Sequence, residues 1–95
     1  MAVGLVMDFD NFTLEDYDKV CSALNFPADW PDGLLVHGSS EVGGQLRVSD
    51  VWESREKFDA YVRQRLAPGI VEAMGDRAEQ PRLREQALHT FYSRT

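Results

Sequence analysis

The sequence is poor in cysteine, because Cys21 is the only one among its 95 residues. A single thiol cannot form an internal disulfide, which favours a reducing compartment such as the cytoplasm. No apolar run approaches the ~18 residues that a membrane span needs. The N-terminal stretch MAVGLVMDFD also lacks the basic segment and small-residue cleavage site of a signal peptide. We therefore expect a cytoplasmic protein with no membrane association.

Basic residues are scarce as well. The chain carries 10 Lys and Arg against 16 Asp and Glu, for a net charge of −6. Residues 1–45 contain one basic residue, Lys19, against eight acidic ones, and residues 46–95 contain nine against eight. Nucleic-acid binding requires a clustered cationic surface, so we expect no nucleic-acid partner. Glycine-rich phosphate loops, dinucleotide fingerprints and nucleophile elbows are absent too.

The overall composition is that of an ordinary globular protein, with 43% apolar and 27% charged residues. We expect one domain over residues 1–95. A domain of this size buries only roughly 65% of the surface that its unfolded chain exposes. Pairing with a second copy would therefore bury additional surface.

Local patterns predict six main elements. Thr13, followed three residues later by Asp16, is typical of a helix N-cap, and Ser54 begins a second helix in the same way. EVGG at 41–44 has hairpin-turn chemistry, and Pro68-Gly69 should kink or interrupt the second helix. The expected ranges are a strand at 2–9, a helix from 14 to about 25, strands at 33–40 and 46–54, a helix to about 75, and a strand from about 82 to 93.

This order of strand, helix, strand, strand, helix, strand predicts an α+β, ferredoxin-like fold. In that fold four antiparallel strands carry both helices on one face. The third strand alternates between two sets of residues. We expect Val51, Ser49 and the stem of Arg47 to face the helices. Leu46, Val48, Asp50 and Trp52 would then lie on the open face, buried against a second copy in a homodimer. The opposite assignment of the two faces remains an alternative.

The stretch GGQLRVSDVWESREKFDAYVRQRLAP, residues 43–68, resembles the dimeric α+β barrel superfamily, and within it the antibiotic-biosynthesis-monooxygenase-like proteins. The shared signature is a glycine hairpin, an apolar strand ending in Trp-x-Ser, and an acidic-capped helix. The resemblance implies that the open sheet faces of two subunits close into a barrel with a cavity in each protomer. It also implies that Trp52 and Asp50 face that cavity.

The sequence departs from this family at positions that carry chemistry. The haem-degrading branch has a histidine where this chain has Val62, and an asparagine on the first strand, which residues 2–9 lack. The quinone-forming oxygenases tend to have asparagine and tyrosine where this chain has Val48 and Phe58. We therefore expect no haem. We expect no other cofactor either, and the two polar positions of the quinone-forming oxygenases are apolar in this chain.

Three residues are candidates for acid–base catalysis: Asp50, His37 and His89. Burial among apolar neighbours raises the pKa of a carboxyl group toward the range in which it acts as a general acid or base. Histidine works near pH 7 without such help. The structural alternative for Asp50 is an ion pair across the dimer interface. Its candidate partners are Arg47, Arg82 and Arg84. The two histidines and Asp50 come from three different strands, so we expect no metal site.

Aromatic and apolar residues suggest a pocket for a planar ligand. The candidate lining residues are Trp52, Val48, Phe58, Phe91 and Tyr92, and Trp30 is a candidate lid. All of these could instead belong to the core or to an interface.

Three functions follow from these patterns. The first is a cofactor-independent monooxygenase or cyclase that acts on a small planar hydrophobic substrate, phenolic or polyketide-type. The second is a non-catalytic ligand-binding or dimerisation module. The third is a regulatory protein whose acidic N-terminal half docks onto a basic partner.

Overall fold

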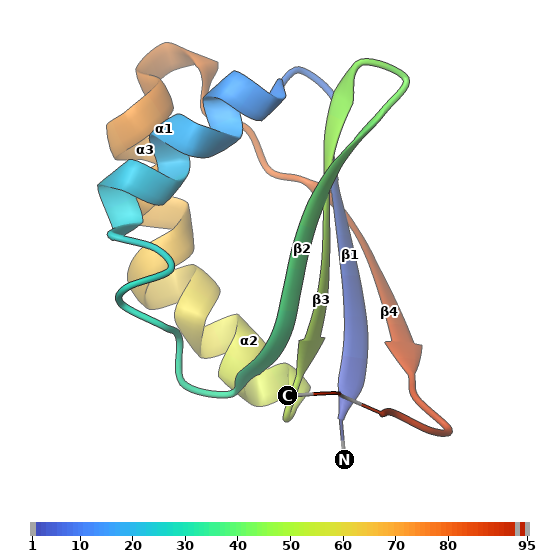
Figure 1. The fold of residues 1–95 in the computed structure, drawn as a ribbon. Helices are drawn as coiled ribbons and strands as arrows, with labels where there is room; N and C mark the ends of the chain where they lie inside the picture. The colour runs from blue at the N-terminus through green and yellow to red at the C-terminus, as the bar shows by residue number, and fades with distance from the viewer. Residues whose placement is uncertain (1, 93, 95) are drawn as a thin grey trace.

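The computed structural model describes residues 2–92 and 94. Its four strands form one antiparallel sheet in the order β2-β3-β1-β4, and the helices cover one face of it (Figure 1). This is the expected ferredoxin-like arrangement. The elements are β1 (Val3–Phe9), α1 (Leu14–Leu24), β2 (Leu34–Val42), β3 (Gln45–Trp52), α2 (Arg55–Tyr61), the π-helical η1 (Val62–Leu66), α3 (Ala67–Met74), the 3₁₀ turn η2 (Gly75–Arg77) and β4 (Arg82–Ala87).

Helix α1 begins and ends where the local pattern predicts. The Thr13 side chain accepts a hydrogen bond from the Asp16 backbone N–H, and the Asp16 carboxylate accepts one from the Thr13 N–H. This reciprocal capping box satisfies two of the amides that a helix start leaves without partners. At the other end Asn25 adopts a left-handed conformation with φ 53°, a common way to end a helix.

The helix that starts at Ser54 is not broken at Pro68. Instead it widens into the π-helical turn η1, in which the Ala67 N–H bonds to the Val62 carbonyl, and then continues as α3. Proline cannot donate a hydrogen bond to the preceding turn. We attribute the widened turn to this missing bond, so the predicted interruption takes the form of η1.

The predicted assignment of the β3 faces was wrong, and the alternative is correct. Leu46, Val48, Asp50 and Trp52 all lie under the helices, each less than 10% exposed. The reason is that the two sets of side chains on β3 differ in how much apolar surface they offer to the helices. Trp52 packs against the aromatic rings of α2, whereas the opposite set contains Arg47, Ser49 and only one large apolar residue.

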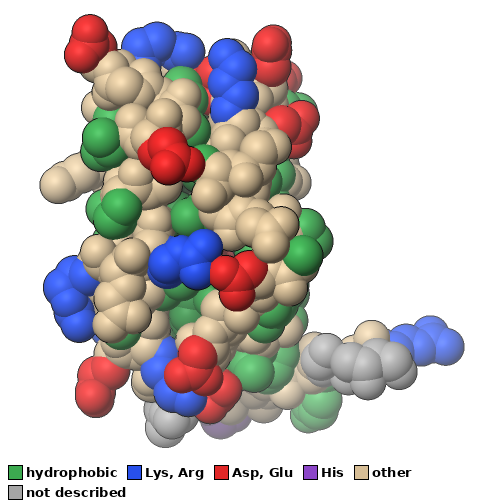
Figure 2. All heavy atoms as spheres, turned by 90° about the vertical axis from the view of Figure 1, so that its left-hand side faces the viewer, with side chains coloured by type: hydrophobic (Ala, Val, Ile, Leu, Met, Phe, Trp, Pro, Cys, Tyr) green, Lys and Arg blue, Asp and Glu red, His purple; other side chains and the backbone are tan. Residues whose placement is uncertain are grey.

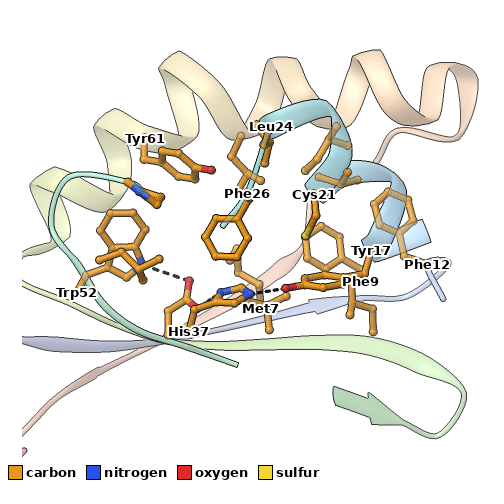
Figure 3. A pocket seen from close by; sticks show the side chains of 18 residues that line it. Met7, Phe9, Phe12, Tyr17, Cys21, Leu24, Phe26, His37, Trp52 and Tyr61 are labelled. Carbon is orange, nitrogen blue, oxygen red and sulfur yellow. Dashed lines mark hydrogen bonds and ion pairs between the residues drawn. The ribbon is translucent and has the colours of Figure 1, made fainter. Parts of the chain in front are cut away.

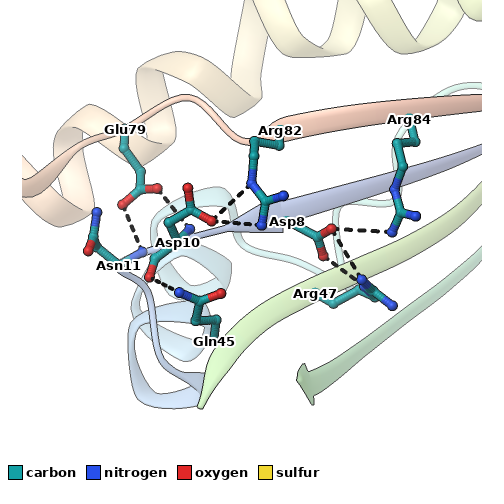
Figure 4. Close-up of polar contacts among 8 residues, drawn as sticks. All are labelled: Asp8, Asp10, Asn11, Gln45, Arg47, Glu79, Arg82 and Arg84. Atoms are coloured by element: carbon teal, nitrogen blue, oxygen red, sulfur yellow. Dashed lines mark hydrogen bonds and ion pairs between the residues drawn. The ribbon is translucent and has the colours of Figure 1, made fainter. Parts of the chain in front are cut away.

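The uncovered face of the sheet, here called the open face, carries a group of ion pairs (Figure 4). Asp8 accepts hydrogen bonds from Arg47 at 2.7 and 3.2 Å and from Arg84 at 3.3 Å, while Arg82 pairs with Asp10 at 2.8 Å. The hydrogen bond from Arg47 lowers the pKa of Asp8 below its ordinary value. These are the three arginines predicted as candidate partners of Asp50. Within the single chain they bind other carboxylates instead, because Asp50 is on the other face.

Two strand boundaries also differ from prediction. Strand β2 continues through Val42, and β4 ends at Ala87 rather than near residue 93, which itself lies outside the described residues. The glycine pair explains the first difference. Gly43 and Gly44 have φ of 59° and 82°, which suits a two-residue hairpin turn and allows both strands to pair up to its edge.

The acidic first half of the sequence and the more basic second half are largely joined by ion pairs within the chain. Arginines and lysines of residues 46–95 form ion pairs with aspartates of residues 1–45, including Arg77–Asp16, Arg65–Asp29 and Lys57–Asp32. The helix-covered side accordingly shows acidic and basic groups interspersed (Figure 2). This mixture gives little support to docking through an acidic half. Within the described residues, none of the helices has the length and apolar character needed to cross a membrane.

Candidate functional site

A small apolar cavity of about 60 Å³ lies between the helices and the sheet. Its walls come from β1, α1, β2, β3, the loop at 25–33 and the α2–η1–α3 segment. Figure 3 shows the lining side chains converging from these elements. We call this the inner cavity. Its volume is well below the ~300–1,000 Å³ of pockets that bind drug-sized ligands.

Four side chains form a continuous line of hydrogen bonds along the inner cavity. The Trp52 Nε1–H donates to Asp50 Oδ2 at 3.2 Å, Asp50 Oδ1 lies 2.7 Å from His37 Nδ1, and His37 Nε2 lies 2.6 Å from the Tyr17 hydroxyl (Figure 3). If the Asp50 carboxylate is the acceptor, as an ionised carboxylate must be, Nδ1 of His37 carries the proton of this hydrogen bond. In a neutral imidazole, Nε2 then accepts the proton of Tyr17. We call these four residues the polar relay.

The hairpin register places His37 beside Asp50. Val42 and Gln45 pair across the two-residue turn, and counting back along both strands pairs His37 with Asp50. Trp52 follows Asp50 by two residues and therefore lies on the same side of β3. Tyr17 reaches His37 from helix α1 above the sheet, where its ring stacks on the imidazole at 5.9 Å between centroids.

The relay is largely shielded from solvent. The side chains of Asp50 and His37 are 4% and 16% exposed. Burial raises the pKa of Tyr17 to about 12 and also raises the pKa of the Cys21 thiol. Both groups are therefore neutral near pH 7. In the described part of the chain, every buried polar atom of a side chain has a hydrogen-bond partner.

The structure brings four of the predicted site residues to the inner cavity: Asp50, His37, Trp52 and Val48. Phe58 lies behind Trp52, with an edge-to-face contact at 5.5 Å. Trp30 stacks on Phe26 and donates its indole N–H to the Leu34 carbonyl at 2.7 Å. It therefore packs over the loop rather than lining the cavity.

The three remaining candidates, His89, Phe91 and Tyr92, follow the end of β4 and are exposed. None of them lines the inner cavity. The strand ends before reaching them, so strand alternation does not apply to these positions.

Sequence reasoning missed Tyr17, which lies with Leu14, Val20 and Leu24 at helical spacing in an otherwise apolar stripe. A hydroxyl group within an otherwise apolar stripe was the available signal. Nothing in the sequence pairs it with His37, because that contact depends on how α1 crosses the sheet. Cys21, one turn later, also lines the cavity. No cluster of three or more metal-binding side chains occurs among the residues that the structure describes.

Neither the protein-family models nor the curated proteins match this sequence. Solved structures do match it in fold. Rv0793 from Mycobacterium tuberculosis superposes with a TM-score of 0.70 at 15% identity, covering 98% of this chain and 100% of that one. A proposed antibiotic biosynthesis monooxygenase from Deinococcus radiodurans gives 0.63 at 10% identity, covering 100% and 99%. Another from Chloroflexus aurantiacus gives 0.60 at 14% identity, covering 98% of each chain.

The chain has the same fold as these solved structures. This agrees with the α+β, ferredoxin-like arrangement that the sequence predicted for a single chain. At 10–15% identity, the match concerns the backbone arrangement alone.

Proposed function

We propose that this protein is a cytoplasmic, cofactor-independent acid–base enzyme of the monooxygenase-like or cyclase-like type. Its substrate is a hydrophobic compound with an acidic hydroxyl group, such as a phenol or an enol of polyketide type. The observation that carries the proposal is the polar relay in the wall of an apolar cavity. A buried, oriented imidazole is well suited to general base catalysis.

The proposed chemistry uses His37 as the base. The substrate hydroxyl donates its proton to the Tyr17 oxygen as Tyr17 passes its own proton to His37 Nε2, leaving a substrate anion and an imidazolium. Asp50 stabilises the imidazolium through Nδ1, as a carboxylate does for the histidine of a catalytic triad. The anion can then react with molecular oxygen or attack a carbonyl group of the same substrate.

This assignment gives Asp50 a different role from the one first considered. Both oxygens of its carboxylate are occupied, one by His37 and the other by Trp52. Asp50 is therefore placed to orient and stabilise His37 rather than to accept a proton from the substrate. Trp52 holds Asp50 and fills the space between the sheet and α2.

The proposal includes a homodimer formed through the open face of the sheet. Val36 and Val51 are paired neighbours there; Val36 is 38% exposed, and Val51 is half-buried. The Asp8–Arg47–Arg84 group neutralises part of the charge at the centre of this face. An isologous pairing of two such faces would bury the valines.

The decisive experiment compares His37→Gln with His89→Gln. His89 is an exposed histidine away from the cavity, which makes it a matched control. Small phenols and enolisable diketones should be screened for oxygen uptake and for new products by mass spectrometry. We expect turnover by the parent protein and by His89→Gln, with a loss of at least about 100-fold in His37→Gln. Equal turnover by both variants would reject His37 as the base.

A non-catalytic ligand-binding module is the second candidate. The observation in its favour is that the relay already satisfies all of its members without a ligand, as a structural hydrogen-bond network would. Saturable binding of phenols with no turnover of any compound in the screen would favour this function.

A further inference from the structure

The inner cavity is smaller than the substrates proposed for it. Its volume of about 60 Å³ accommodates a few water molecules, and a planar ring system does not fit. A larger hollow of about 800 Å³ lies outside it, between the α2–η1–α3 segment and β4. We call this hollow the outer groove. Its volume is within the ~300–1,000 Å³ range of small-molecule sites.

The inner cavity and the outer groove share one wall. Three side chains line both of them: Met7 from β1, Leu66 from the end of η1 and Ile70 from α3. We call these three side chains the partition. All three are apolar, and no side-chain hydrogen bond or ion pair within the described residues holds them in place. Met7 and Ile70 belong to the buried core and Leu66 packs against it, so apolar packing alone holds this wall closed.

We propose that the outer groove and the inner cavity form a single substrate site when the partition opens. The hydroxyl end of the substrate reaches the polar relay, and its apolar body lies in the groove. The substrate class is then an elongated, planar hydroxy-aromatic compound rather than a compact one. This inference rests on the proposed function, because the relay defines which end of the substrate enters.

The dimensions of the sheet agree with such a substrate. Met7 on β1 pairs with Val48 on β3, which pairs with Ser39 on β2 beside His37. Neighbouring strands lie ~4.8 Å apart, so the distance across two strand spacings is about 10 Å. A fused ring system of two or three rings spans that distance. Its far end would still lie in the groove while its hydroxyl group meets Tyr17.

The opposite side of the cavity is a less suitable entrance. A cleft of about 210 Å³ adjoins it there through Pro31 and Tyr61. Ion pairs fasten the loop that borders this cleft, because Arg65 binds Asp29 at 2.6 Å and Lys57 binds Asp32 at 3.3 Å. Opening here would break these pairs, whereas opening the partition breaks none.

The local chemistry of the partition also favours movement. Methionine is unbranched and adapts its shape more readily than other core residues. Leu66 is the last residue of the π-helical turn, and such turns often occur at functional sites. The neighbouring Val71 is 60% exposed at the groove. It offers a position where the groove can be blocked without disturbing the core.

The test uses 2-naphthol as the probe, with binding followed by its fluorescence and by amide chemical shifts of the labelled protein. Val71→Arg should block the groove and weaken binding by about tenfold or more. Leu14→Arg is the matched control, because Leu14 is also an exposed apolar residue, 42% exposed, but lines neither space. Ile70→Ala should open the partition and strengthen binding. We expect shifts at both Val62 in the groove and Val48 in the cavity.

Several outcomes would overturn the inference. Shifts confined to the groove would mean that the partition stays closed. Shifts confined to the cavity, with no effect of Val71→Arg, would place the entrance elsewhere. A change in sedimentation on Val71→Arg would identify the groove as an interface between copies. Absence of 2-naphthol binding would reject this inference.

The proposed function has a separate readout. If 2-naphthol contacts both spaces but His37→Gln leaves turnover in the phenol screen unchanged, the joined site stands and the catalytic role of His37 fails. If His37→Gln abolishes turnover of small phenols while 2-naphthol never enters the cavity, the catalytic role stands and the joined site fails. The two proposals can therefore fail independently.

Discussion

The indole N–H of Trp52 donates a hydrogen bond to Asp50 Oδ2 at 3.2 Å, from two residues further along the same strand. The second oxygen of Asp50 binds His37. A carboxylate held at both oxygens has a fixed orientation, and so does the imidazole that it binds. Asp50 and Trp52, two residues apart in the sequence Asp-Val-Trp, thus lie on the same side of β3 and together hold His37 in place.

Asp50→Asn tests this support directly. The amide keeps the shape of the side chain, but it carries no charge to stabilise an imidazolium. We expect a loss of about 1–3 kcal/mol in the free energy of unfolding, because the hydrogen bonds of a buried group are disturbed. Urea denaturation measures that loss, and ¹⁵N NMR of His37 reports its tautomer. Retention of the Nδ1-protonated tautomer at unchanged stability would contradict the orienting role of Asp50.

Tyr17 should make stability fall at high pH. Its pKa in the folded protein is about 12, above the ordinary value of 10.0, chiefly because of burial. The unfolded chain therefore releases this proton first as the pH rises. The contribution of Tyr17 is fully present below about pH 10 and is lost between about pH 10 and 12. Denaturation at a series of pH values should show this decline, and Tyr17→Phe should make it shallower. An identical decline in both proteins would argue against a buried, neutral Tyr17.

The contribution of Asp16 to stability should depend on pH in the opposite direction, falling as the pH is lowered. A hydrogen bond from Arg77 lowers its pKa to about 2 from the ordinary 3.8. The stabilisation is complete above about pH 4 and is lost as the pH falls toward 2. Because Arg77 is 55% exposed, we discount the contribution for solvent screening to about 1–2 kcal/mol.

Arg77→Gln should reduce that acid dependence. The control is Arg63→Gln, since Arg63 forms no ion pair among the residues that the structure describes. Denaturation between pH 2 and 6 should show a smaller fall in stability for Arg77→Gln than for either Arg63→Gln or the parent. Parallel curves for all three proteins would show that the Arg77–Asp16 contact contributes little in solution.

The close approach of α3 to α1 gives a packing prediction. A Cβ atom at Gly69 would lie 2.5 Å from Leu24 Cδ2 and 3.0 Å from its Cγ. Gly69→Ala should therefore cost about 1–3 kcal/mol of stability, although alanine favours helix more than glycine does. In a Leu24→Ala background the same substitution should cost less, because the clash is gone. Equal costs in the two backgrounds would mean that the cost does not come from contact with the Leu24 side chain.

Local patterns in the sequence predicted the elements and the topology well. The helix caps at Thr13, Asp16 and Ser54 form hydrogen bonds only with residues a few positions away, so they can be predicted without the tertiary structure. The face of β3 could not be assigned in the same way. Alternation separates the strand into two sets, but which set the helices cover depends on Trp52 packing against α2. Tyr17 was missed for a similar reason, because its partner is 20 residues away on another element.

This correction also changes the physical argument for a homodimer. The residues first expected to drive it are covered by the helices, so the proposed interface depends on the open face instead. That face places Val51 beside Val36, and further along the same face Asp8 neutralises part of the charge of Arg47 and Arg84. Val51→Glu should add a buried, unpaired charge to each copy and separate them.

Analytical ultracentrifugation should show a dimer for the parent and a monomer for Val51→Glu, with circular dichroism unchanged. Val71→Glu provides the matched control, because Val71 lies on the helical side at the outer groove and should leave the dimer intact. A dimer that survives Val51→Glu but dissociates with Val71→Glu would move the interface to the helices. In that case the outer groove would be covered by a second copy, and no substrate would lie in it.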